Sequence, residues 1–392
     1  MFCANKKVIG QLTKCYSVAK ISDGGESKLL CAAEKQDPCY MFHVDGEKVD
    51  TLWEGPGGVM TLEQFPCEDE TVVMATRKFY SPNDSADAKI VYYTRDGGGW
   101  KERVLCDLPF VHRFGLLQRG GRRYLIACTL KSDHAFKNDW SCPGRVWVAE
   151  LSGDIREYSA EQQLALTPLV SGLYHNHGFA KVTEEDGTVW ALVGTDKGVL
   201  KVVPPAEAEG AWETELLLAE ATSDMLYEDF DGDGKRELLV MAPFHGEKLA
   251  VFHEAGEGLA APVFGDAPVT EVTPGVQGVK VLTADGAKEI SASSKRFEKV
   301  WQYPEDMPFL HAIYTAGVAG KKLAIVGARE GKKELLALYY DSETKSYVTD
   351  VLDEGAGPAN ALFFTEDGRD MVLAANRETD EIALYEITMK EN

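Results

Sequence analysis

The amino-acid sequence predicts an all-β protein folded as a single β-propeller. Short apolar runs of strand length alternate with Asp-Gly, Gly-Gly and Glu-Gly turns, and this pattern repeats about every 40 to 60 residues, the period expected for propeller blades. Helical periodicity is nearly absent, and the best helical candidate is the short segment 160–166. No proline-rich, serine-rich or low-complexity linker interrupts the chain, so we expect residues 1–392 to form one domain.

Seven pairs of strands can be recognised along the chain, each an inner strand followed by a strongly apolar second strand. The inner strands are expected to begin near Tyr16, Val59, His112, His177, Met225, His311 and Asn360. Seven blades are favoured; eight is the alternative, because residues 278–301 could form a short eighth blade or the outer part of the fifth. The last repeat supplies only about three strands, so residues 6–11 are expected to add its outer strand and close the ring.

The bulk composition limits the partners and the compartment. The net charge is −22 and the pI is about 4.8, so the field of the molecule repels phosphate backbones and anionic membrane surfaces. We expect no nucleic-acid partner and no membrane partner. The N-terminus lacks the apolar core of a signal peptide, which favours a cytoplasmic protein with reduced cysteines, either a monomer or a small homo-oligomer.

An acidic run at residues 229–237 reads Asp-Phe-Asp-Gly-Asp-Gly-Lys-Arg-Glu, with carboxylates at alternate positions and glycine where a sharp turn is needed. Alternating carboxylates can wrap oxygen ligands around Ca²⁺, and the run resembles the calcium loops of integrin-type propeller repeats. The alternative is a plain hairpin turn between two strands. We expect a structural calcium site whose ligands are Asp229, Asp231, Asp233 and Glu237.

Histidines recur at or next to the expected starts of inner strands. Four of the eight are in this position: His112, His175, His177 and His311. Inner strands of a propeller start on one face near the axis, so these side chains should converge there. The long polar segment 129–144 should place Lys131 and His134 over the same face. A single histidine could equally serve the core or a turn, but the recurrence favours a shared site.

Common catalytic motifs are missing from the sequence. It contains no GxSxG elbow, no P-loop, no GxGxxG after a strand and no HExxH, which argues against serine hydrolases, nucleotide-dependent enzymes and zincins. No acidic residue recurs at the inner-strand starts, so the carboxylate pair of a glycosidase is not indicated.

Six stretches of the chain carry a family resemblance: residues 57–60, 77–91, 111–114, 128–144, 175–178 and 355–360. Together they resemble the seven-bladed propeller polysaccharide lyases that cleave L-rhamnose-α-1,4-D-glucuronate and, more distantly, the ulvan lyases. The similarity covers roughly residues 57–386. It implies β-elimination at a uronic acid, in which the carboxylate is neutralised, a base removes the C5 proton and an acid protonates the departing C4 oxygen.

The resemblance also implies roles for individual residues. The base is His134 or His112, and the acid is Tyr174 or the other histidine. The candidate catalytic residues are His112, His134, Tyr174 and His177. The candidate substrate-binding residues are Arg113, Lys131, His175, Asn176 and His311, with Arg113, Lys131 and Asn176 as the carboxylate clamp.

Three functions stay open at this point. The leading one is a carbon–oxygen lyase that acts on small anionic oligosaccharides or glycosides. The second is a metal-dependent dehydratase resembling the propeller portion of aldos-2-ulose dehydratases, with His112, His134 and His177 around a catalytic divalent ion. The third is a non-catalytic scaffold that binds partners on its faces, although converging histidines disfavour it.

Overall fold

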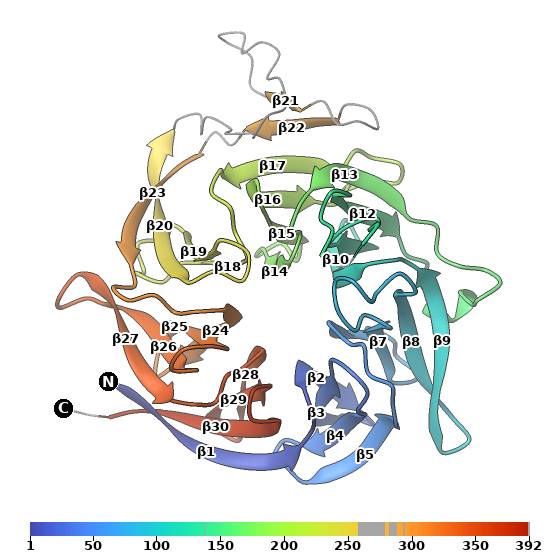
Figure 1. The fold of residues 1–392 in the computed structure, drawn as a ribbon, viewed down its shortest axis with the longest axis horizontal. Helices are drawn as coiled ribbons and strands as arrows, with labels where there is room; N and C mark the ends of the chain where they lie inside the picture. The colour runs from blue at the N-terminus through green and yellow to red at the C-terminus, as the bar shows by residue number, and fades with distance from the viewer. Residues whose placement is uncertain (137, 258–278, 282–287, 293–294, 391–392) are drawn as a thin grey trace.

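Seven blades of four antiparallel strands surround a central axis (Figure 1). The structure is a computed structural model that describes residues 1–136, 138–257, 279–281, 288–292 and 295–390. Five blades are separate sheets, whereas the third and fourth are joined by a single residue pair, Gln118 with Val189. The predicted seven-bladed propeller is therefore confirmed.

The strands of the first four blades, from the axis outward, are as follows. Blade 1 contains β2 (Cys15–Asp23), β3 (Glu26–Ala33), β4 (Cys39–His43) and β5 (Lys48–Trp53). Blade 2 contains β6 (Leu62–Phe65), β7 (Val72–Arg77), β8 (Lys89–Asp96) and β9 (Gly99–Asp107). Blade 3 contains β10 (Val111–Arg119), β11 (Arg122–Thr129), β12 (Gly144–Glu150) and β13 (Thr167–Leu173). Blade 4 contains β14 (Gly178–Thr183), β15 (Val189–Thr195), β16 (Gly198–Val203) and β17 (Glu213–Leu218).

The remaining three blades follow the same order. Blade 5 contains β18 (Asp224–Glu228), β19 (Glu237–Ala242), β20 (Lys248–Glu257) and β23 (Lys295–Gln302). Blade 6 contains β24 (Leu310–Val318), β25 (Lys321–Ala328), β26 (Leu335–Asp341) and β27 (Ser346–Asp353). Blade 7 contains β28 (Asn360–Glu366), β29 (Arg369–Asn376), β30 (Glu381–Met389) and, as its outer strand, β1 (Phe2–Gln11).

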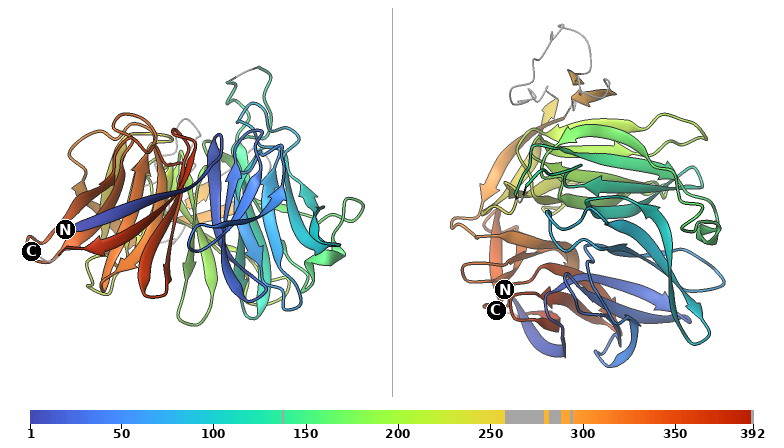
Figure 2. Two further views of the ribbon diagram at one scale, coloured as in Figure 1. Left: turned by 90° about the horizontal axis from the view of Figure 1, so that it is seen from below. Right: turned by 45° about the vertical axis from the view of Figure 1, so that its right-hand side comes forward.

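The ring is closed by the N-terminal strand, as the sequence predicts. β1 pairs antiparallel with β30 from Phe2 opposite Met389 to Gln11 opposite Glu381. The two chain ends consequently lie side by side (Figure 2). This pairing covers the edge that β30 would otherwise leave open.

The core lies between neighbouring blades. Every residue of the second strands β7 and β19 is buried, because each blade packs a neighbour against both of its faces. One apolar cluster, for example, joins Leu30 and Ala32 of blade 1 to Val73 and Ala75 of blade 2. This double-sided packing explains why second strands are continuous apolar runs rather than alternating ones.

The segment after β20 departs from a simple repeat. β23 completes the fifth blade, which confirms one of the two expectations for residues 278–301. The short strands β21 (Val279–Val281) and β22 (Lys288–Ala292) pair with each other, and β22 adds in parallel to the outer edge of β17. Gly278 lies outside the described residues.

Helix is confined, in the described part of the chain, to one 3₁₀ turn, Ile155–Glu157 (η1). The expected helical segment 160–166 is wrong: it forms bends and coil. Among the residues described, no helix has the length and apolarity that a membrane crossing requires.

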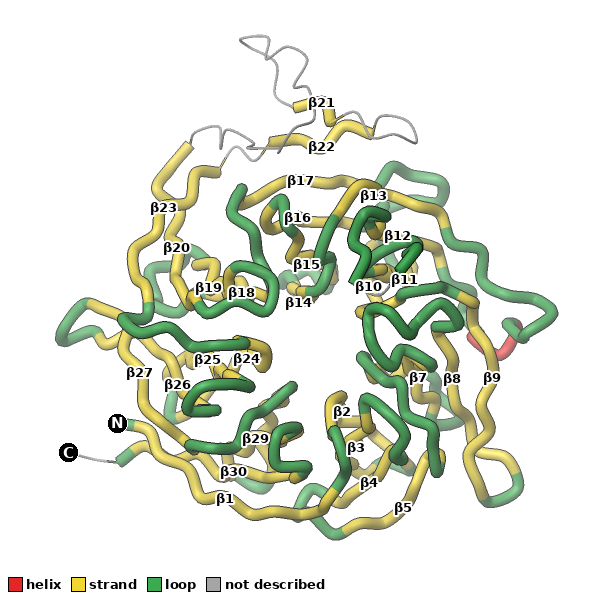
Figure 3. Tube along the Cα trace, in the orientation of Figure 1, coloured by secondary structure: helices red, strands yellow, loops and turns green. Residues whose placement is uncertain are grey.

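Topology decides which loops share a face. We call the face at which the inner strands begin the top face. Because neighbouring strands run antiparallel, the turn between the second and third strand of each blade lies on the top face as well. Loops from all seven blades surround the axis (Figure 3).

Candidate functional site

Four histidine rings from four consecutive blades meet at the top face. His112 is in β10, His177 directly precedes β14, His245 is in the β19–β20 turn and His311 is in β24. The ring centre of His177 lies 4.5 Å from that of His112, 4.9 Å from that of His245 and 5.2 Å from that of His311. We call these four residues the histidine cluster.

Backbone carbonyls orient two of the rings. The Nδ1 atom of His177 lies 3.2 Å from the carbonyl oxygen of Ser223, and that of His311 lies 2.5 Å from the carbonyl oxygen of Ala359. A carbonyl can only accept, so both Nδ1 atoms carry the proton and both Nε2 atoms present a lone pair.

The unprotonated ring nitrogens of the cluster differ in their hydrogen-bond partners. The Nε2 atom of His311 accepts a hydrogen bond from the Tyr16 hydroxyl at 3.0 Å. The buried Nε2 atom of His177 and the buried Nδ1 atom of His112 have no hydrogen-bond partner among the described residues. Buried ring nitrogens without partners are uncommon and are candidates for binding a ligand.

Burial keeps the cluster uncharged. His112, His177 and His311 are 3%, 1% and 2% exposed, and desolvation holds the pKa of each well below its ordinary value. Burial also lowers the pKa of His245 to about 3, and the positive charge of Arg329 adds to this effect. At neutral pH the four rings are therefore neutral imidazoles.

Three of these rings fit a metal ion. His177, His245 and His311 each offer a nitrogen, and the three atoms lie within 4.8 Å of one another. Neutral imidazoles whose other nitrogen donates to a backbone carbonyl are typical ligands of divalent transition metals. The Tyr16 hydroxyl would compete with an ion for the lone pair of His311.

A row of aromatic rings continues from the cluster across the top face. Ring centres are 4.7 Å apart for Trp140 and His175, 4.5 Å for His175 and Phe244, 3.9 Å for Phe244 and His245, and 4.3 Å for His245 and Phe309. All five rings are partly exposed. We call this row the aromatic rim.

The structure brings together three of the predicted site histidines, His112, His177 and His311. His175 lies beside them on the aromatic rim. Two members of the site were not predicted. His245 lies in a second-to-third-strand turn instead of before an inner strand, and Tyr16 was used only to mark a strand start. The signal for His245 was its place in the turn Ala-Pro-Phe-His-Gly, since such turns also lie on the top face.

The other predicted site residues lie outside the cluster, and the potential metal ligands are His177, His245 and His311 instead of the expected His112, His134 and His177. The ammonium of Lys131 is fully buried and donates to Asn83 Oδ1 at 3.0 Å and to the carbonyl oxygen of Asp139 at 2.6 Å. These two hydrogen bonds of Lys131 fix the position of the β11–β12 segment. His134, on the same segment, packs edge-on against Phe110 with ring centres 5.7 Å apart.

Tyr174 and Asn176 belong to the loop before β14. The backbone N–H of Tyr174 donates to Asp196 Oδ1 at 2.9 Å, and its side chain is partly exposed. Asn176 is fully buried, and its side-chain amide donates to the carbonyl oxygen of Arg145 at 2.9 Å. Asn176 thus holds the loop that presents His175 and His177.

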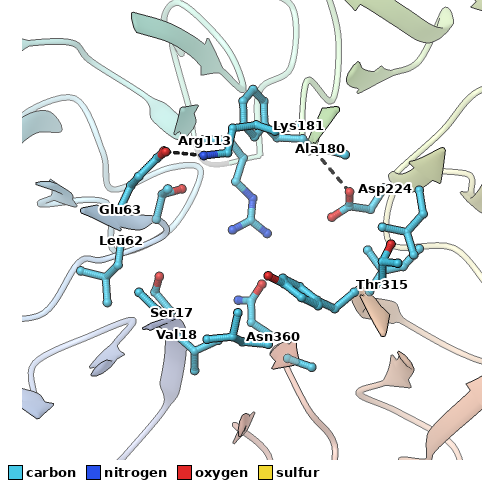
Figure 4. A pocket seen from close by; sticks show the side chains of 18 of the residues that line it. Ser17, Val18, Leu62, Glu63, Arg113, Ala180, Lys181, Asp224, Thr315 and Asn360 are labelled. Carbon is cyan, nitrogen blue, oxygen red and sulfur yellow. Dashed lines mark hydrogen bonds and ion pairs between the residues drawn. The ribbon is translucent and has the colours of Figure 1, made fainter. Parts of the chain in front are cut away.

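Arg113 points into an axial cavity of about 620 Å³ lined by the inner strands (Figure 4). Its guanidinium donates to the carbonyl oxygen of Met60 at 2.7 Å. Asp224 faces the same cavity and accepts from the backbone N–H groups of Phe179 at 3.3 Å and Met225 at 3.0 Å. Burial raises the pKa of Asp224 to about 6, and the charge of Arg113 partly opposes that rise.

The acidic run forms the β18–β19 turn, far along the fifth blade from the top face. Three of the four expected calcium ligands, Asp231, Asp233 and Glu237, offer carboxylate oxygens to one group together with His253 of β20. Asp229 is not part of that group.

Comparisons with known proteins agree with this architecture. No protein-family model matches the chain, and a search of the curated proteins finds no match. The chain is a β-propeller. Among solved structures, streptogramin B lyase is similar at 13% identity with a TM-score of 0.50, covering 99% of this chain and 98% of that one.

Two further propellers are similar at the same level. The β-propeller domain of Cps50 (Swd1) from Myceliophthora thermophila has 12% identity and a TM-score of 0.54, covering 98% of this chain and 100% of that one. BBS1N, solved in complex with ARL6DN, has 12% identity and a TM-score of 0.54, covering 100% and 97%. Likeness at this identity shows the fold alone, and the resemblance to polysaccharide lyases stays a prediction.

Proposed function

We propose that this protein is a metal-dependent carbon–oxygen lyase that acts on a small uronate-bearing glycoside. The observation that supports the proposal most directly is the trio His177, His245 and His311, whose offered nitrogens lie within 4.8 Å of one another. A divalent ion bound there would supply a Lewis acid next to the substrate carboxylate.

The surroundings of the trio favour an anionic sugar. Burial is the largest cause of the lowered pKa of His311, and the charges of Arg329 and Arg113 add to it, although Arg329 is also paired with Glu378 at 2.7 Å. Two cationic groups thus lie near the cluster, within a chain whose net charge is −22. The partly exposed aromatic rim beside the trio offers apolar ring faces on which a sugar can stack.

Elimination at a uronate needs two proton transfers. A base takes the proton from C5, the C–H electron pair becomes the C4–C5 double bond, and the C4–O bond breaks. The departing oxygen then receives a proton from an acid. The buried imidazoles are poor bases because burial lowers their pKa, which suits them to ligand roles instead.

Proton transfer therefore belongs to partly exposed groups at the top face. We assign it to His175 and Tyr174, which share the loop before β14 with the proposed ligand His177. Burial lowers the pKa of His175 as well, but its ring is partly exposed and can therefore meet a substrate. His134 on the β11–β12 segment is the alternative base. His112 packs against His177 with ring centres 4.5 Å apart and supports the position of that ring.

The test is an elimination assay with controlled metal content. The protein is stripped with a chelator, reloaded with Mn²⁺ or Zn²⁺, and incubated with a panel of glucuronate-terminated disaccharides while the absorbance of unsaturated uronate is followed. We expect product only after reloading. The substitution His177→Gln should lower turnover at least about 100-fold, the scale of a lost catalytic group.

The matched control is His43→Gln, because His43 lies in β4 of blade 1 and contacts Lys28 instead of the cluster. Turnover of a free sugar derivative with no uronate product would favour the dehydratase. A folded protein that neither retains metal at the trio nor turns over any substrate would refute the proposal and favour a binding scaffold.

A further inference from the structure

A second group of metal-ligating side chains joins the β18–β19 turn to β20. Asp231, Asp233, Glu237 and His253 each offer one ligand atom, and all four atoms lie within 4.8 Å of one another. The Nε2 atom of His253 lies 3.1 Å from Asp233 Oδ2 and 3.8 Å from Glu237 Oε1. The group therefore combines three carboxylates with one imidazole.

Several carboxylate oxygens of the turn accept hydrogen bonds from backbone N–H groups of the same turn. Both carboxylate oxygens of Asp229 are occupied, because Oδ1 accepts from the N–H of Gly232 at 2.7 Å and Oδ2 from that of Gly234 at 3.1 Å. Asp233 Oδ1 accepts from the N–H of Lys235 at 2.7 Å, which leaves Oδ2 facing His253. Asp229 thus shapes the turn, whereas the Oδ2 atom of Asp233 is directed at His253 and the rest of the group.

Glu237 provides an independent sign of a cation site. Its side chain is 0% exposed, and its Oε2 atom accepts from the N–H of Phe230 at 2.7 Å. Its Oε1 atom accepts no hydrogen bond of good geometry among the described residues; the Tyr347 hydroxyl lies near Glu237, and Oε1 is 3.8 Å from His253 Nε2 in the group. A buried carboxylate oxygen without a partner costs free energy, and a bound cation would remove that cost.

We propose that Asp231, Asp233, Glu237 and His253 bind one divalent transition-metal ion of the Zn²⁺ class. Imidazole nitrogen is a favourable ligand for such ions, whereas Ca²⁺ takes about six to eight oxygen ligands. The fourth carboxylate that a calcium loop would use, Asp229, is already bonded to the turn. The proposal differs from the sequence-based expectation in both ligand set and ion.

The bound ion would fasten two separate parts of the fifth blade. Asp231 and Asp233 come from the turn, Glu237 begins β19, and His253 lies in β20. These are consecutive strands of one sheet, so the ion would act as a cross-link between the turn and the third strand of the blade. The site is independent of the histidine cluster, with which it shares no residue.

The experiment measures zinc content and thermal unfolding of the full chain. Stripped protein is equilibrated with Zn²⁺ or with Ca²⁺ and desalted, and bound metal is counted per chain. The variants are His253→Gln and, as a second test on an exposed side chain, Asp233→Asn. We expect each variant to retain one zinc ion fewer per chain than the wild type and to lose part of the zinc-dependent rise in melting temperature.

The control His43→Gln should bind as much zinc as the wild type. Counting the difference between variant and wild type keeps the result separate from any metal at the histidine cluster. Zinc content that is unchanged in both variants would overturn the proposal and leave an ion pair between His253 and the carboxylates. Retention of Ca²⁺ but not Zn²⁺, abolished by Asp229→Asn, would also overturn it in favour of an all-oxygen calcium loop.

Discussion

Replacing Asp224 by asparagine should stabilise the protein at neutral pH. Asp224 begins β18, is buried, and faces the axial cavity. Burial raises the pKa of its carboxyl from 3.8 to about 6, whereas Arg113 and two backbone N–H groups act in the opposite direction. The folded state therefore holds this proton more tightly than the unfolded chain does.

The sign and size of the effect follow from that difference. Below about pH 4 the carboxyl is protonated in both states, and the stabilising effect of the raised pKa is fully present. This stabilising effect is lost as the pH rises through about 6, because the folded protein must then bury a charged carboxylate. A difference of about two pKa units corresponds to about 3 kcal/mol at pH 7.

Asparagine keeps the oxygen that accepts from Phe179 and Met225 and carries no charge. Urea unfolding of the metal-free wild type and of Asp224→Asn between pH 4 and pH 7 measures the effect. The free energy of unfolding should be nearly equal at pH 4 and should favour the variant by about 3 kcal/mol at pH 7. A variant that is less stable at pH 7 would show that attraction to Arg113 outweighs desolvation, and the reasoning would fail.

Three further predictions concern the cluster and the ring. Burial lowers the pKa of His245 from 6.5 to about 3, so the metal-free protein should lose stability as the pH falls below 6.5. Urea unfolding at pH 7 and pH 5 should show that His245→Gln removes ~2 kcal/mol of this loss. Gly178→Ala should lower both melting temperature and metal retention, because a Cβ would collide with the backbone of Ser223 and Asp224 beside His177. Deleting residues 1–11 should cause aggregation in size-exclusion chromatography, since β30 loses its partner strand.

Much of the fold could be predicted from local pattern. The expected inner-strand starts at Tyr16, His112 and Asn360 lie within one residue of the observed starts of β2, β10 and β28. Second strands are recognisable because burial on both faces demands an unbroken apolar run, and glycine turns mark where each run ends. The convergence of His112, His177 and His311 followed from their equivalent places in different blades.

The sequence by itself favoured seven blades over eight, and it indicated the closure of the ring by residues 6–11 and the recurrence of histidine at strand starts. Only the tertiary structure decided that His245 and Tyr16 join the cluster, that Arg113 turns into the axial cavity, and that His253 faces the acidic turn. The physical reason is that strand patterns depend on near neighbours along the chain. Contacts between blades depend instead on how the closed ring sets the angle and height of each sheet around the axis, and no local run of residues carries that information.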